Sequence, residues 1–143
     1  MQTFLPYADY AKSAAVIDNS RLGNQCYREC KTLIQGGWKN HPAAKMWVGH
    51  EFHLAKYSLA LAHEMGERTK PDGSPKWKPE VVERWTEFWT VQMFLFDNTG
   101  PPAWLGNRKL HQSHRSNLLR KDPEHYRKFW PKLRDDLPYI WPV

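Results

Sequence analysis

A single carboxylate lies among several basic side chains near the start of the chain. Glu29 falls within residues 18–35, DNSRLGNQCYRECKTLIQ, together with Arg21, Arg28 and Lys31. Basic side chains attract phosphates, and a carboxylate beside them can accept and return protons. We therefore predict that these bases hold a polyanion and that Glu29 takes part in its chemistry. A structural ion pair between Glu29 and a neighbouring base is the alternative.

A second basic set lies near the C-terminus and is interleaved with aromatic residues. It comprises Arg108, Lys109, Arg115, Arg120, Lys121, Arg127, Lys128, Lys132 and Arg134, with His125, Tyr126, Phe129 and Trp130 among them. Cations beside aromatic rings suit a phosphate backbone and unstacked bases. From both basic sets we predict these DNA-binding residues: Arg21, Lys31, His114, Arg115, Arg120, Lys121, Tyr126, Lys128 and Trp130. A solvated helix face with core aromatics is the alternative.

Two histidine pairs support a competing interpretation, a metal-dependent nuclease. His50 and His53, like His111 and His114, are one helical turn apart. A zinc site needs three or four convergent ligands, so one pair is insufficient. The sequence contains no HExxH, paired CxxC, GxSxG or Gly-rich phosphate-loop motif. We therefore expect no metal and no cofactor, and we keep the histidine nuclease as an alternative.

Length and composition favour one basic, intracellular domain spanning residues 1–143. The chain has 143 residues, a formal net charge of +6 and eight tryptophans, a balance that favours a nucleic-acid partner. It contains no apolar run of roughly 20 residues, and its N-terminus does not resemble a signal peptide. Its two cysteines, Cys26 and Cys30, would share one helix face as reduced thiols. We expect no membrane association and no secretion.

Hydrophobic spacing and capping residues predict a mainly α fold, with an extended segment at residues 1–7 and an extended tail from residue 133. The predicted helices span residues 11–17, 20–35, 41–68, 80–96, 107–121 and 123–130. Asp9 is the predicted cap of the first helix, and Asp18 or Asn19 of the second. The predicted buried positions of the second helix are Leu22, Cys26, Cys30 and Leu33. Polar or proline-rich loops are expected at residues 69–79 and 98–106.

Four segments spread along nearly the whole chain carry a family resemblance. They are MQTFLPYADY, IDNSRLGNQCYRE, GWKNHPAAKMWVGHE, and PPAWLG followed by LHQSHRSNLLRKDPEHY. Together with Tyr27-Arg28-Glu29, they resemble the pyrimidine-dimer DNA glycosylase family of the phage endonuclease V type. The resemblance implies a compact helical domain, a viral or bacterial origin, and a monomer acting on double-stranded DNA with a damaged base or abasic site.

The resemblance also implies a bifunctional reaction that needs no metal. Members of the family cut the glycosidic bond of a damaged pyrimidine and then nick the backbone by β-elimination. The nucleophile is the α-amine of the first residue, which forms a Schiff base with sugar C1′. A glutamate, matched here by Glu29, supports the proton transfers, and Arg28 matches a phosphate-holding neighbour. An α-amine has an ordinary pKa of about 7.7–8.0, so a useful fraction is neutral at pH 7.

The chain departs from the family's best-known enzyme at two positions. There the amine belongs to a threonine exposed by methionine removal, whereas Gln2 is too large for that processing. Either Met1 supplies the amine, or another protease trims the chain and exposes a residue such as Gln2, or the lyase chemistry differs or is lost. The second helix also has one residue more before Glu29, so Arg28 is the alternative at the catalytic position. A non-catalytic DNA-binding module on the same scaffold is a further alternative.

Overall fold

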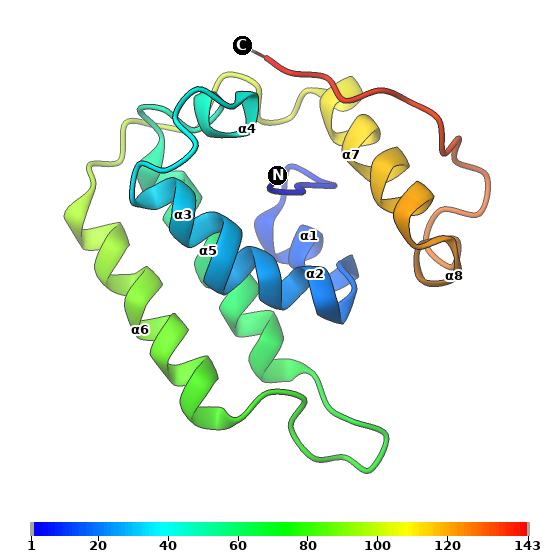
Figure 1. Ribbon diagram of the computed structural model, residues 1–143, viewed down its shortest axis with the longest axis horizontal. Helices are drawn as coiled ribbons and strands as arrows, with labels where there is room; N and C mark the ends of the chain where they lie inside the picture. Colours follow the sequence, from blue (N-terminus) through cyan, green and yellow to red (C-terminus); the bar gives the residue numbers. More distant parts are fainter. Residues whose placement is uncertain (1, 143) are drawn as a thin grey trace.

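The computed structural model describes residues 2–142 and is built from helices (Figure 1). They are α1 (Tyr10–Val16), α2 (Asn19–Asn24), the π-helical turn η1 (Gln25–Glu29), α3 (Cys30–Ile34), α4 (Pro42–Lys45), α5 (Glu51–Glu67), α6 (Pro79–Leu95), α7 (Arg108–Lys121) and α8 (Pro123–Tyr126). Outside the helices, Thr69 and Pro75 form a β-bridge. The predicted mainly α class is confirmed. None of the helices in residues 2–142 combines the length and apolarity needed to cross a membrane.

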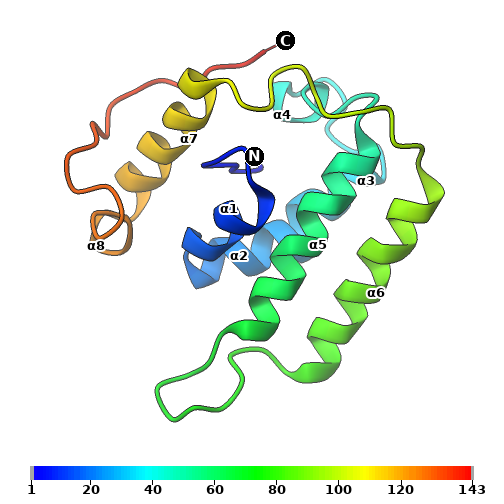
Figure 2. The same cartoon turned by 180° about the vertical axis from the view of Figure 1, so that it is seen from behind.

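The helices form two groups with the N-terminal segment between them. In Figures 1 and 2, α5 and α6 lie side by side, and the run from α2 to α3 crosses α5. On the other side, α7 and α8 form a second group, and the C-terminal tail runs back along α7. Each group has its own buried apolar cluster. The first includes Leu22, Tyr57 and Trp89, and the second includes Leu118 and Tyr126.

The predicted helix caps account for the starts of α1 and α2. The Asp9 carboxylate accepts the Lys12 N–H at 2.9 Å, and the Asp18 carboxylate accepts the Arg21 N–H at 3.3 Å. The helical run from Asn19 to Ile34 agrees with the predicted helix 20–35. Its predicted apolar positions are all buried, namely Leu22, Cys26, Cys30 and Leu33. Capping and apolar spacing therefore sufficed to locate this helix.

The prediction of one helix over residues 41–68 is wrong. The chain leaves the helix after α4 and restarts at α5, with Gly49 in the left-handed region at φ 80°. This break lets Trp47 turn inward. Its Nε1–H donates to Thr3 Oγ1 at 3.0 Å, and its ring meets that of Trp104 edge to face, with centroids 5.0 Å apart. The predicted last helix, 123–130, is also too long, because α8 ends at Tyr126.

The N-terminal segment forms no β-ladder, and side chains bond its backbone instead. The Phe4 N–H donates to Gln25 Oε1 at 2.6 Å. The Phe4 carbonyl accepts the Tyr57 hydroxyl and, at 3.4 Å, the Gln25 Nε2–H. Gln25 and Tyr57 are both buried. A buried backbone group without a partner costs about 1–3 kcal/mol, so these two side chains fix the path of the segment.

Helix α7 holds the next residues of the segment in the same way. The Leu5 N–H donates to His114 Nδ1 at 2.9 Å, and His111 Nδ1–H donates to the Leu5 carbonyl at 2.9 Å. Arg115 donates to the Pro6 carbonyl at 2.6 Å. We call Gln25, Tyr57, His111, His114 and Arg115, which bond the backbone of residues 4–6, the N-terminal clamp.

A buried contact between α8 and the start of α2 joins the two helix groups. The Tyr126 hydroxyl donates to the Asp18 carboxylate and accepts the Asp18 N–H at 2.9 Å. Burial alone would raise the pKa of the Asp18 carboxyl. The Tyr126 hydrogen bond and the Arg21 charge outweigh that effect and lower the pKa below its usual value. The Tyr126 ring also stacks on Trp130, whose Nε1–H donates to the Tyr7 hydroxyl at 2.8 Å.

The clamp makes stability depend on pH through His114. Burial, followed by the nearby His111, lowers the pKa of His114 to about 3. Below pH 6.5 the unfolded chain therefore binds a proton that the folded chain does not. The free energy of unfolding consequently decreases as the pH is lowered. We expect His114 to remove roughly 2 kcal/mol of unfolding free energy between pH 6.5 and pH 5. Urea denaturation at both pH values measures this change.

The variant His114→Asn keeps an acceptor but does not titrate. Its unfolding free energy should therefore vary less with pH than that of the wild type, by the same roughly 2 kcal/mol. His63→Asn, at an exposed position of α5, is the matched control and should retain the wild-type pH dependence. An unaltered pH dependence in His114→Asn would contradict this account.

Candidate active site

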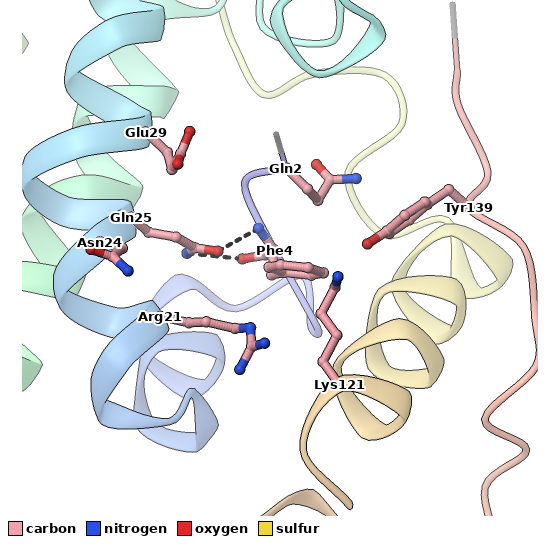
Figure 3. Close-up of a pocket in the computed structure, with 8 residues that line it drawn as sticks. All are labelled: Gln2, Phe4, Arg21, Asn24, Gln25, Glu29, Lys121 and Tyr139. Carbon is pink, nitrogen blue, oxygen red and sulfur yellow. Dashed lines mark hydrogen bonds between the residues drawn. The ribbon is translucent and has the colours of Figure 1, made fainter.

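A cavity of about 340 Å³ opens where four parts of the chain meet (Figure 3). Its lining comes from the α2–η1 helix, the N-terminal segment, the end of α7 and the tail. The residues are Arg21, Asn24, Gln25 and Glu29; Gln2 and Phe4; Lys121; and Tyr139. We call it the Glu29 cavity. It brings together Glu29, Gln2, Arg21 and Lys121, which the sequence had suggested separately.

The π-helical turn η1 decides which acidic or basic residue faces the cavity. Successive residues of an α-helix turn by about 100°, so Arg28, seven after Arg21, would point within roughly 20° of it. Glu29 would then point roughly 80° away. Instead, the Cys30 N–H bonds to the carbonyl of Gln25, five residues back. The extra residue in this turn brings Glu29 round to the cavity and directs Arg28 to solvent.

Side-chain exposure agrees with this geometry. The side chain of Arg28 is 73% exposed and that of Glu29 is 24% exposed, and their charged groups are 4.0 Å apart. Arg28 therefore does not line the cavity, although it can neutralise part of the Glu29 charge.

Trp89 on α6 supplies the partner that the π-helical turn requires. In a regular α-helix the Cys26 carbonyl would accept the Cys30 N–H, but in η1 that N–H bonds elsewhere. The carbonyl accepts the buried Trp89 Nε1–H at 3.1 Å instead. π-turns of this kind are frequent at functional sites.

Within residues 2–142, the charged side chains that line the cavity are two cations and one carboxylate. Arg21 donates to Asp18 at 3.2 Å, which orients its guanidinium from below the cavity. Lys121 projects from the end of α7 (Figure 3) and forms no ion pair within residues 2–142. The two cations come from opposite walls, so both can contact a phosphate group that enters the cavity.

Several predicted DNA-binding residues are buried or bonded within the protein, so we do not propose them as DNA contacts. His114 and Tyr126 are fully buried and Trp130 is 8% exposed. Arg115 bonds the Pro6 carbonyl and lies over the Tyr7 ring at 5.3 Å. The aromatic and basic pattern near the C-terminus therefore reflects packing and the N-terminal clamp at these positions.

The remaining predicted cations lie on the surface outside the cavity. Lys31 lies 5.8 Å from the centroid of the Trp85 ring on α6, and Lys128 lies 5.9 Å from that of Phe129. Arg120 donates to Asn117 and to a tail carbonyl. Their contribution to DNA binding stays a prediction.

Met1, a predicted source of the nucleophilic amine, lies outside the described residues.

The histidines do not form a shared metal site among residues 2–142, where no group of three possible ligands converges. His111 uses both ring nitrogens within the fold, because Nε2 accepts the Gly106 N–H at 3.0 Å while Nδ1 bonds Leu5. His53 Nδ1 lies 2.9 Å from the Tyr10 hydroxyl. The metal-dependent alternative therefore has no ligand set in this range.

Four residues of the cavity were not predicted as site residues. Asn24 and Gln25 follow Arg21 by three and four positions, so helical spacing could have found them. Phe4 and Tyr139 bring aromatic rings, with centroids 6.3 Å apart and planes 44° apart. Nothing in the sequence indicated that the tail would bring Tyr139 to the α2 helix, because this proximity arises from tertiary packing alone.

Comparison with known families assigns the chain to a family. The model of the pyrimidine dimer DNA glycosylase family matches residues 1–77. The chain belongs to this family. The matched part includes Gln2, Arg21 and Glu29, whereas Lys121 and Tyr139 lie beyond it. No curated protein and no solved structure matches the chain. Family membership makes the protein a DNA glycosylase and its substrate DNA that carries base lesions.

The position of Lys121 predicts a specific change in salt dependence. One phosphate contact contributes about 0.9 to the slope of log affinity against log salt concentration. We expect Lys121→Gln to reduce that slope by about 1 in magnitude. Lys70→Gln, in the exposed loop between α5 and α6, is the matched control and should change it less. Fluorescence anisotropy over a salt series measures both slopes, and equal slopes for wild type and Lys121→Gln would exclude the contact.

Proposed function

We propose that the protein excises damaged pyrimidines from double-stranded DNA and then nicks the strand as an AP lyase. One observation carries the proposal: Gln2, the first described residue, lines the same cavity as Glu29, with Arg21 and Lys121 on its walls. An N-terminal amine close to a carboxylate and two phosphate-binding cations is the set of groups that this reaction needs.

The reaction begins at C1′ of the damaged nucleotide. The neutral amine attacks C1′, the bond from C1′ to the base breaks, and the base leaves with a proton. Opening of the sugar ring gives a Schiff base between the amine and C1′. Loss of a C2′ proton then expels the 3′ phosphate by β-elimination. Glu29, the carboxylate of the described cavity lining, accepts and returns the protons, which typically accelerates such steps roughly 10²–10⁴-fold.

The source of the amine is part of the proposal. We assign it to Met1, because the long side chain of Gln2 opposes methionine removal. Gln2 would provide the amine only if another protease trimmed the chain. The packing of Gln2 into the Glu29 cavity supports an amine at the start of the chain.

We further propose that residues 1–143 act as one domain and as a monomer within the cell. Lys121 and Tyr139 complete a cavity whose other wall belongs to the family-matched part of the chain. One chain therefore provides all of the described lining, and a second copy is not needed to close it.

Borohydride trapping tests the lyase part of the proposal. Incubation with abasic-site DNA and sodium borohydride should yield a covalent complex, because borohydride reduces the Schiff base to a stable amine. Peptide mass mapping should place the DNA on the α-amine of Met1. Attachment to a lysine would show that a lysine side chain, and not the terminal α-amine, is the nucleophile. Tight DNA binding without any trapping would favour a non-catalytic DNA-binding module.

The pair Glu29→Gln and Arg28→Gln tests which residue of η1 acts. We expect Glu29→Gln to slow strand cleavage by roughly 10²–10⁴-fold with DNA binding largely kept, because it removes the proton carrier. Arg28→Gln should slow cleavage less than about 10-fold, since Arg28 faces solvent. Single-turnover cleavage of dimer-containing duplex measures both rates. A larger loss of cleavage rate in Arg28→Gln than in Glu29→Gln would show that the acting residue is not the one that η1 turns toward the cavity.

A further inference from the structure

Trp38 is exposed, and its backbone has a conformation that tryptophan rarely adopts. It lies in the loop of residues 36–41, between α3 and α4, and the residue is 57% exposed. Its φ of 58° is in the left-handed region, which no other non-glycine residue of 2–142 occupies. A bulky side chain enters that region only at a cost in energy. The loop therefore accepts strain although the core does not use the indole.

Hydrogen bonds on both sides hold this conformation. The Gly37 N–H donates to the Thr32 carbonyl at 2.9 Å, and the His41 N–H donates to the Trp38 carbonyl at 2.8 Å. The indole is thus presented to solvent by a bonded loop. Strained residues that the surrounding structure holds in this way cluster where proteins bind their ligands.

A row of aromatic rings connects the loop to the Glu29 cavity. Trp38 meets His41 edge to face with centroids 6.1 Å apart, and His41 meets Trp141 of the tail at 6.0 Å. The Trp141 ring lies 5.4 Å from that of Tyr139, which lines the cavity. In both Figure 1 and Figure 2 the end of the tail lies beside α4. A few base pairs of duplex, at about 3.4 Å each, would span this row.

The charge around the loop favours DNA as the partner of the indole. Between Glu29 and Glu51 the sequence contains three lysines and no acidic residue. Two of them, Lys39 and Lys45, are exposed and form no ion pair within residues 2–142. DNA offers phosphates to the lysines and base faces to the indole. It is also the substrate of the family to which the chain belongs.

Damaged DNA can offer a base-pair face without any base leaving the duplex. A lesion weakens stacking with its neighbours, so the duplex kinks more easily at that step. A kinked step is partly unstacked, and an inserted apolar side chain covers the face that the kink uncovers. In intact DNA the same insertion must first break normal stacking. A side chain that inserts in this way therefore binds distorted duplex better than intact duplex.

We propose that Trp38 is a DNA-binding residue that inserts at the kinked step beside the lesion and stacks on the base pair that the kink uncovers. The contact rests on the part of the proposed function in which the protein binds damaged double-stranded DNA, and it does not depend on the lyase reaction. It makes the protein select distorted DNA before any bond is cut.

Two duplexes of the same sequence test this contact. One carries a tetrahydrofuran abasic analogue, which interrupts stacking and has no aldehyde with which to form a Schiff base. The other is undamaged. Fluorescence anisotropy at one salt concentration gives dissociation constants of both duplexes for the wild type, Trp38→Ala, Trp38→Gly and Trp38→Phe. The ratio of the two constants is the preference for the lesion.

We expect Trp38→Ala and Trp38→Gly to bind the lesion duplex roughly 10- to 100-fold more weakly, the effect of losing one stacked ring. Binding of the undamaged duplex should weaken less than about threefold. Trp38→Phe keeps a ring and should retain most of the preference. Phe94→Ala is the matched control, because Phe94 is an 87% exposed aromatic residue of α6 outside the row, and it should keep the wild-type preference.

A 2-aminopurine base beside the analogue reports the stacking directly, because its fluorescence is quenched when a ring stacks on it. At saturating protein, the wild-type complex should fluoresce less than the Trp38→Ala complex. A preference within about twofold of the wild type in both Trp38→Ala and Trp38→Gly would overturn the proposal. An equal loss of affinity on the two duplexes would also overturn it, since such a contact does not sense distortion.

Two further readouts separate the possible failures. Thermal unfolding should show Trp38→Gly at least as stable as the wild type, because glycine adopts a φ of 58° without strain. If Trp38→Ala unfolds early, Trp38→Gly decides the preference. Absence of base excision and trapping in the wild type would overturn the proposed reaction, whereas the binding preference still decides the role of Trp38.

Discussion

The backbone of residues 4–6 is the constraint on which the rest of the structure depends. It crosses the interior without a β-ladder, so its polar groups must bond side chains. The N-terminal clamp meets this requirement from α7, α5 and η1. The clamp binds both helix groups to the same segment, which places Gln2 at the Glu29 cavity. Residues suited to DNA contact or metal binding by type, such as His114 and Arg115, are used for this purpose instead.

The chemistry of the cavity depends on a local departure from regular α-helix. Because η1 contains one extra residue in its turn, Glu29 faces the cavity and Arg28 faces solvent. Trp89 stabilises this departure by bonding the carbonyl that the turn leaves without its usual partner. A residue on α6, outside the family-matched part of the chain, thus supports the orientation of the proposed proton carrier.

Much of the fold was predictable because caps and apolar spacing are local. Asp9 and Asp18 cap the first two helices. The apolar positions from Leu22 to Leu33 are buried, as predicted. The break at Gly49 was not predictable from periodicity, since the apolar steps continue through it. Four residues of the cavity lining, Glu29, Gln2, Arg21 and Lys121, were predicted as site residues. Their meeting with Tyr139 in one cavity could not be predicted, because it depends on which distant segments come together in the folded chain.

The N-terminal clamp also affects the order of events during synthesis. Leu5 bonds His114, which lies 109 residues later in the chain. At roughly 5–20 residues per second, the ribosome delivers α7 several seconds after residue 5. Until then the segment lacks the three clamp side chains of α7, His111, His114 and Arg115, and is open to the enzymes that process nascent N-termini. The chemical identity of the terminal amine is therefore decided before the site that would use it exists.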